Sequence, residues 1–177
     1  MTKITPSITF HFRVGDEAPS FKPDGCPIGG EFVRKTAQEL FGGKRVIVFS
    51  LPGAYTPTCS TYQLPGFEEN YDKIKSMGID EIYVASVNDA FVMNAWAAVL
   101  GIKNVKVLPD GNGEFANNLG MLSDFSAVGF GRRSRRFAVV LNDGDVEKFF
   151  VEPPSSADNP DPYGETSPET VMSYLSK

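Results

Sequence analysis

The sequence predicts an α/β fold in which helices flank a central mixed sheet. Three observations support this: short buried strands alternate with amphipathic helical patterns, a β-hairpin signal follows, and a helical pattern closes the chain. At 177 residues with 41% hydrophobic content, the chain is long enough to bury a substantial core. Because neither a repeat nor an interdomain linker is visible, we expect one domain over residues 1–177, with an N-terminal arm at about residues 1–20.

Short apolar runs predict parallel strands, and amphipathic stretches predict the helices that connect them. Strands rich in β-branched and aromatic residues are expected at residues 45–51, 81–87 and 105–108. Helices are expected at residues 65–77, 89–100 and 113–119. Pro65 should start or kink the first of these helices, and Asn88 is the expected N-cap of the second.

The C-terminal part predicts a hairpin, a long loop and a last helix. Residues 136–141 and 146–151 flank the turn sequence NDGD, which favours an antiparallel pair. Residues 153–168 hold five prolines and are expected to form a long loop. The last helix should begin near Thr166 or Ser167, with Glu169 completing a capping box with Thr166.

Turn-forming residues place the other loops of the chain. Residues 21–30, FKPDGCPIGG, are expected to form a loop that holds Cys26, and another loop should run through Asp124 and Gly131. Residues 31–40 are expected to be partly strand and partly a helical turn.

Composition excludes several classes of partner. A net charge of −5 and a pI near 4.9 argue against nucleic acid or an anionic membrane as the main partner. No apolar run approaches the about 18 residues of a membrane span, and the N-terminus lacks the apolar core of a secretory signal. Two cysteines do not make a disulfide scaffold, so a reducing cytoplasm is expected. With His11 the single histidine, a Cys–His protease and a structural zinc site are both disfavoured, and no cofactor or metal is expected.

The stretch with the strongest chemical signal is residues 50–62, SLPGAYTPTCSTY. It indicates the end of a buried strand, a Pro/Gly loop and a cysteine at the start of a helix. A helix start offers unpaired N–H groups and the positive end of the helix dipole. A thiol there should ionise more readily than a free cysteine, so Cys59 is predicted to be a poised thiolate.

The spacing of Pro52, Thr56 and Cys59 suits in-line attack of a thiolate on an O–O bond. Pro52 can shield the sulfur from bulk water, and Thr56 can place a hydroxyl beside the sulfur and the incoming oxygen. A fast peroxidase also needs an oriented donor that stabilises charge as the O–O bond breaks. Arg136 is the predicted donor because it opens a rigid strand, with Arg133 and Arg135 as the alternatives in the same basic run.

The motifs PGAYTPTCS, SVNDAFVMNAW and GRRSRRF closely resemble the peroxiredoxins, in particular the type II plant and peroxiredoxin-five-like branch. The resemblance runs from about Val14 to the C-terminus. It implies a thioredoxin-like fold and a cofactor-free, thiol-dependent peroxidase that acts on hydrogen peroxide and alkyl hydroperoxides in antioxidant defence. By the same resemblance Cys59 is the peroxidatic cysteine and Arg136 the active-site arginine. A homodimer is implied through the loop at residues 52–55 and the helix that carries Trp96.

The chain departs from many relatives in having no cysteine after Cys59. The sulfenic acid must then be reduced by an outside thiol, such as glutathione, glutaredoxin or thioredoxin, or by Cys26 acting as the resolving cysteine within a chain or across a dimer. A different class of function, a peroxide-sensing redox switch that acts on a partner protein, is the alternative hypothesis. Rapid turnover with an added thiol distinguishes the peroxidase from the switch.

Overall fold

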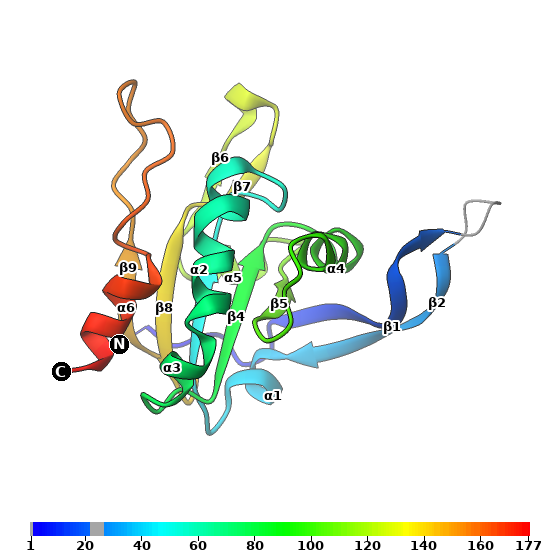
Figure 1. Cartoon of the computed structure of the whole chain (residues 1–177), viewed down its shortest axis with the longest axis horizontal. Coiled ribbons are helices and arrows are strands. Elements are labelled where there is room, and N and C mark those ends of the chain that lie inside the picture. The colour runs from blue at the N-terminus through cyan, green and yellow to red at the C-terminus, as the bar shows by residue number, and fades with distance from the viewer. Residues whose placement is uncertain (1, 22–26) are drawn as a thin grey trace.

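The computed structural model describes residues 2–21 and 27–177, and at its centre lies a five-stranded mixed sheet (Figure 1). The strands run in the order β5-β4-β3-β8-β9. The parallel strands are β3 (Arg45–Ser50), β4 (Glu81–Ser86) and β5 (Lys106–Pro109). The antiparallel ones are β8 (Phe137–Asn142) and β9 (Asp145–Val151). The predicted α/β class, the parallel strands and the C-terminal hairpin are confirmed.

The central strands are apolar throughout because both faces of the sheet are covered. Along β3, Ile47 and Phe49 point into one core, whereas Val46 and Val48 point into the other, and all four side chains are fully buried. Successive side chains of a strand face opposite sides, so a strand between two cores needs apolar residues at every position. This explains why residues 45–51 show no polar alternation.

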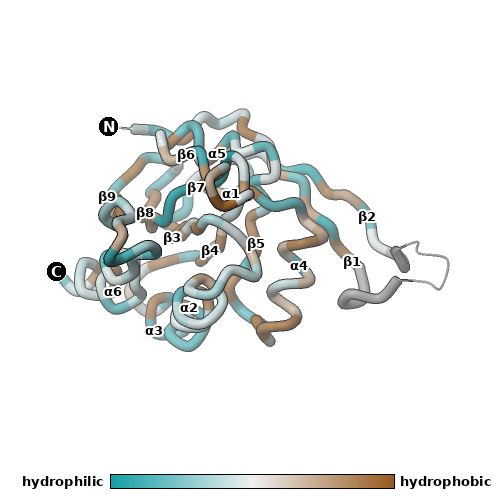
Figure 2. Tube along the Cα trace, turned by 90° about the horizontal axis from the view of Figure 1, so that it is seen from above, coloured by the Kyte–Doolittle hydropathy of each residue, from teal (hydrophilic) through white to brown (hydrophobic). Residues whose placement is uncertain are grey.

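Helices cover each face of the sheet, as Figure 2 shows from above. One face is packed by α2 (Leu64–Glu69), α3 (Tyr71–Lys75), α4 (Ala90–Val99) and α6 (Pro168–Leu175). The other face is packed by α1 (Ala37–Phe41), α5 (Glu114–Asn118) and the segment from Ile4 to Phe10. In the part of the chain that the structure describes, no helix has the length and apolarity to cross a membrane.

The N-terminal arm is longer than predicted. β1 (Thr9–Phe21) and β2 (Pro27–Thr36) pair antiparallel in a hairpin that projects from the body (Figure 1). The predicted loop over residues 21–30 is therefore wrong from Pro27 onward. Backbone pairing of Asp16 with Gly29 and of Phe21 with Pro27 extends the ladder through residues of low strand propensity, because a partner strand outweighs local preference.

Two smaller predictions also need correction. The loop through Asp124 and Gly131 contains a short hairpin of β6 (Leu122–Asp124) and β7 (Arg132–Ser134), with a 3₁₀ turn over Ser126–Val128. The last helix is capped by Ser167, whose side chain accepts from the Thr170 N–H, and not by Thr166. Thr166 is buried and its hydroxyl donates to Glu152 Oε1 at 2.8 Å instead.

Candidate active site

Cys59 is fully buried near the start of a helical stretch that begins at Pro57, directly after the loop that follows β3. The first turns are π-helical over Cys59–Gln63, and the Leu64 N–H donates to the Cys59 carbonyl. Pro65 lies just after the change from π-helical to α-helical geometry. Helical residues precede it back to Pro57, so Pro65 does not start the helix; the alternative, that it kinks the helix, stays a prediction.

Two side chains contact the sulfur of Cys59. Thr56 Oγ1 lies 2.9 Å from Sγ, and Arg136 Nη1 donates to Sγ at 3.3 Å. Thr56 Oγ1 also lies 2.7 Å from the Gly53 carbonyl oxygen. The one hydroxyl hydrogen can serve a single acceptor at a time, so it donates to the sulfur when the sulfur is a thiolate.

Arg136 is 95% buried, with 5% of its surface exposed, and its guanidinium donates hydrogen bonds to three side chains. Nη1 donates to Gln63 Oε1 at 2.6 Å as well as to Cys59, and Nη2 donates to Asp161 Oδ1 at 2.7 Å. Burial alone lowers the pKa of Arg136, but the charge of Cys59 and the bond to Asp161 hold this pKa above its ordinary value. The guanidinium therefore stays cationic beside the sulfur. Its buried Nε has no partner among the described residues.

The two alternative arginines do not reach the sulfur. Arg133 Nη1 donates to the Pro52 carbonyl at 3.3 Å, and Arg135 Nη2 donates to the Glu152 carbonyl at 3.5 Å. Both residues therefore bind backbone segments that border the site, and Arg136 is the arginine that the fold brings to Cys59.

Asn88 holds the loop that carries Pro52. Its Oδ1 accepts from the Ala54 N–H at 3.0 Å and from Ser86 Oγ at 2.7 Å. The predicted N-cap role of Asn88 is wrong, because Asp89 caps α4 by accepting from the Val92 N–H. Sequence alone identified Asn88 as a capping residue type but could not tell which backbone it would bind.

The site opens into a cavity of about 580 Å³ between the β6–β7 hairpin and the loop that follows β9, which lie at the same end of the sheet in Figure 1. Pro52 and Thr56 line it next to Arg136. Most of the remaining wall is apolar, from Pro57, Phe125, Ala127, Val128, Phe130, Pro153, Pro154, Pro160 and Pro162. The cavity can hold a molecule much larger than hydrogen peroxide.

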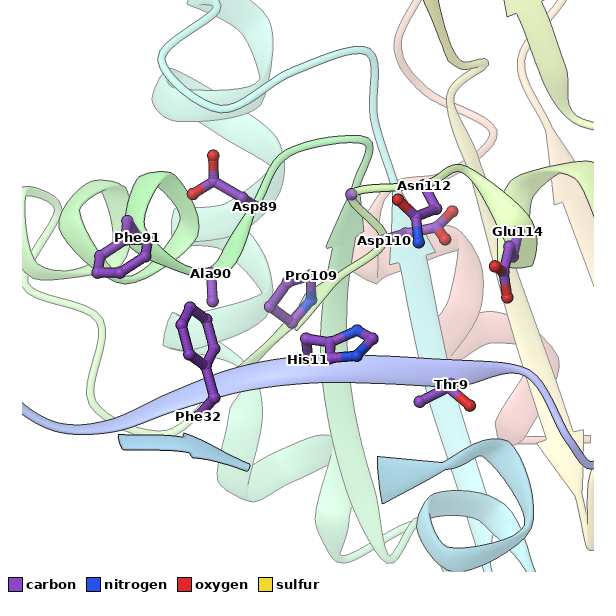
Figure 3. A pocket seen from close by; sticks show the side chains of 11 residues that line it. Thr9, His11, Phe32, Asp89, Ala90, Phe91, Pro109, Asp110, Asn112 and Glu114 are labelled. Carbon is purple, nitrogen blue, oxygen red and sulfur yellow. The ribbon is translucent and has the colours of Figure 1, made fainter. Parts of the chain in front are cut away.

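The sequence singled out two other residues, His11 and Cys26. His11 on β1 lines a separate cavity of about 330 Å³ near Asp89 and Asp110 (Figure 3), and Cys59 is not among the residues that line it. His11 therefore does not serve the sulfur as a base. Cys26, the candidate resolving cysteine, lies outside the described residues.

The comparisons with known proteins agree with this geometry. The Redoxin family model matches residues 13–164. The chain belongs to the redoxin family, among the peroxiredoxins. It is 51% identical over 177 residues to a peroxiredoxin of Rhizobium etli, covering 99% of this chain and 96% of that protein. It is 43% identical over 173 residues to a hybrid peroxiredoxin of Haemophilus influenzae, covering 98% of this chain and 65% of that protein.

Solved structures show the same fold. Reduced Prx3 of Vibrio vulnificus, in complex with hydrogen peroxide, matches with a TM-score of 0.81 and 33% identity, covering 98% of this chain and 93% of that one. A 1-Cys peroxiredoxin of Plasmodium falciparum matches with a TM-score of 0.85 and 32% identity, covering 99% of each chain. The predicted thioredoxin-like fold is thereby confirmed.

Sequence reasoning missed two residues of this peroxiredoxin that contact Arg136. Gln63 follows Cys59 by one helical turn, and this spacing is the signal that could have placed it beside the site. Asp161 lies in a proline-rich loop without periodicity, so no local pattern pointed to it. Trp96 supports the site from α4, because its Nε1 donates to Ser60 Oγ at 2.9 Å.

Proposed function

We propose that Cys59 is the peroxidatic thiol of this peroxiredoxin, with Thr56, Arg136 and Pro52 as its active-site partners. The observation that carries the proposal is the convergence of a hydroxyl at 2.9 Å and a guanidinium nitrogen at 3.3 Å on one buried sulfur. These donors stabilise a thiolate beside the cavity that Pro52, Thr56 and Arg136 line.

The reaction follows from this arrangement. The Cys59 thiolate attacks the terminal oxygen of a hydroperoxide, an S–O bond forms, and the O–O bond breaks. The sulfur becomes a sulfenic acid, and the departing oxygen takes a proton and leaves as water or an alcohol. Negative charge spreads over both oxygens during the attack. Arg136 and the Thr56 hydroxyl are the oriented donors that stabilise it.

Replacing the sulfur tests this assignment. Cys59→Ser should abolish thiol-dependent peroxide consumption while leaving the circular dichroism spectrum and unfolding midpoint close to those of the wild type. Thr61→Ala, at an exposed position in the same helical turn, is the matched control and should retain turnover. Peroxide consumption near the wild-type rate in Cys59→Ser would rule out Cys59 as the nucleophile. The comparisons favour turnover over the redox-switch alternative, because the relatives named above are peroxiredoxins.

The reductant and the role of Cys26 require a separate experiment. The cavity lined by Thr56 and Arg136, the two side chains that contact Cys59, supports reduction of its sulfenic acid by glutathione, glutaredoxin or thioredoxin. Intact mass under non-reducing conditions, after one equivalent of hydrogen peroxide, distinguishes the routes. One added oxygen at Cys59 indicates an outside thiol. Loss of two hydrogens, absent in Cys26→Ser, indicates that Cys26 resolves the sulfenic acid.

A homodimer and a reducing compartment complete the proposal. The loop that carries Pro52 exposes Tyr55, and α4 exposes Phe91 and Val99, so the predicted interface offers large apolar side chains. Light scattering of the wild type and of Tyr55→Asp tests the dimer, which this charge should dissociate. We propose the cytoplasm as the compartment because Cys59 is free and the catalytic cycle consumes thiol reductants.

A further inference from the structure

A carboxylate contacts the active-site guanidinium on the side away from the sulfur. Arg136 Nη1 serves Cys59, whereas Nη2 donates to Asp161 Oδ1 at 2.7 Å. The side chain of Arg136 is 3% exposed and that of Asp161 is 43% exposed. Asp161 therefore places a negative charge at the cavity wall, one guanidinium away from the reacting sulfur.

Hydrogen bonds hold the loop that carries Asp161 at its base and at its tip. At its base, Glu152 Oε1 accepts from the N–H groups of Gly164 at 2.9 Å and Thr166 at 2.8 Å. At its tip, the Ser156 N–H donates to the Asn159 carbonyl at 2.9 Å in a turn. These bonds return the chain toward Arg136, so the position of Asp161 is set by the loop and not only by its ion pair.

The other charged residues that line the cavity are directed elsewhere. Asp124 Oδ1 accepts from the Ser126 N–H at 2.8 Å, and the Glu152 carboxylate is bound to the base of its own loop. Arg135 donates to a backbone carbonyl. Within the described part of the chain, Asp161 is the carboxylate that contacts the active-site guanidinium.

We propose that Asp161 is a specificity-determining residue that disfavours hydroperoxides bearing a carboxylate and so selects neutral ones. A cationic arginine at the end of a large apolar cavity would otherwise attract the acid group of a hydroperoxy fatty acid, since guanidinium and carboxylate groups form strong paired hydrogen bonds. Asp161 already occupies Nη2 and repels a second carboxylate. The apolar wall still accepts the tail of an uncharged organic hydroperoxide. This inference rests on the proposed reaction at Cys59.

The expected size of the effect is modest because Asp161 is partly exposed. Two like charges several ångströms apart in such a site repel enough to change a rate by about three- to tenfold, once solvent screening is included. The discrimination should shrink as ionic strength rises, because salt screens exposed charges.

The test compares a medium-chain hydroperoxy fatty acid with its methyl ester, which share the same tail and peroxide. The second-order rate of oxidation of the reduced protein is measured for each, so that no reductant enters the comparison. The wild type should prefer the ester, and Asp161→Asn should lower the ester-to-acid ratio at least threefold. Asp158→Asn, an exposed position in the same loop outside the cavity lining, should keep the wild-type ratio.

The ratio separates a charge effect from a structural one. Asparagine has nearly the same shape as aspartate and can still accept from Arg136, so a loss of loop structure would slow both substrates alike. An unchanged ratio in Asp161→Asn, or a wild type without preference, would overturn the inference. Absence of reaction with either hydroperoxide and with hydrogen peroxide would overturn the peroxidase chemistry itself.

Discussion

Removal of the Arg136 side chain is the perturbation whose effect the structure defines best. In Arg136→Ala the sulfur loses its guanidinium donor, while the Thr56 hydroxyl remains at 2.9 Å. An oriented donor to developing charge is worth about 10² to 10³ in rate. Nη1 divides its donation between Sγ at 3.3 Å and Gln63 at 2.6 Å, so the bond to sulfur is the longer one. We therefore expect a loss at the lower end, about 100-fold.

The chain supplies its own optical probe for this experiment. Trp96 is the only tryptophan, and its Nε1 donates to Ser60, the residue after Cys59. Its fluorescence should change when Cys59 is oxidised, and stopped-flow mixing with hydrogen peroxide then gives the second-order rate constant without a reductant. Arg135→Ala is the matched control, because the guanidinium of the neighbouring arginine donates to the Glu152 carbonyl and not to the sulfur.

Folding must be separated from catalysis in the same variant. Arg136→Ala leaves the buried Gln63 Oε1 without its donor, which costs about 1–3 kcal/mol of stability. Urea unfolding measures this loss, and Arg136→Lys keeps a positive charge while losing the forked geometry. Lysine should therefore restore part of the rate. A rate constant for Arg136→Ala within threefold of the wild type, in protein shown to be folded, would refute the role assigned to Arg136.

Two further predictions concern the hydroxyl at the sulfur and the junction of α2 with β5. Thr56→Val should lower the oxidation rate about tenfold, because the sulfur loses one donor. Thr58→Val is the control and should keep the wild-type rate, since the Thr58 side chain makes no capping hydrogen bond. Equal rates in Thr56→Val and the wild type would exclude a role for the Thr56 hydroxyl. Burial raises the pKa of Glu68, but backbone N–H donors from residues 103–105 hold this pKa below its ordinary value of 4.5. The stability that these hydrogen bonds confer is therefore present above pH 4.5 and is lost as the pH falls through the lowered pKa. Urea unfolding at pH 7 and pH 3 should therefore show Glu68→Gln destabilised mainly at pH 7. Glu69→Gln should be neutral at both, and a loss in Glu68→Gln that is the same at both pH values would contradict this linkage.

The parts of the site that sequence predicted are those encoded by local patterns. Cys59, Thr56 and Pro52 lie within one loop and helix start, so their spacing in the chain sets their spacing in the fold. Arg136 comes from 77 residues further along, and it was predicted because the hairpin signal gave it a rigid strand. Pairing of Ser50 with Phe137 then puts Arg136 beside the end of β3.

The parts that sequence did not predict depend on contacts between distant segments. Asp161 and Glu152 act through a loop whose path is fixed by hydrogen bonds and not by periodicity. Asn88 has the right residue type for a helix cap, but the competing Ala54 N–H decided its partner. The π-helical turn at Cys59 left no signal because the residues CSTYQ hold no pattern that distinguishes it from an α-helical turn. That residues 1–177 form one domain stays a prediction.

Arg136 is oriented by a series of hydrogen bonds between buried side chains, all donated in the same direction, that ends at the base of the C-terminal loop. Gln63 accepts from Arg136 through Oε1 and donates through Nε2 to Thr166 Oγ1 at 3.2 Å. Thr166 in turn donates to Glu152 at 2.8 Å. A flipped Gln63 amide would direct its NH₂ group at the guanidinium, so the chain has one favourable direction. Because the Thr166 hydroxyl donates its one hydrogen to Glu152, it accepts from Gln63, and this order sets the direction of donation up to Arg136. The loop that borders the cavity and the arginine that contacts the sulfur are therefore positioned by the same carboxylate.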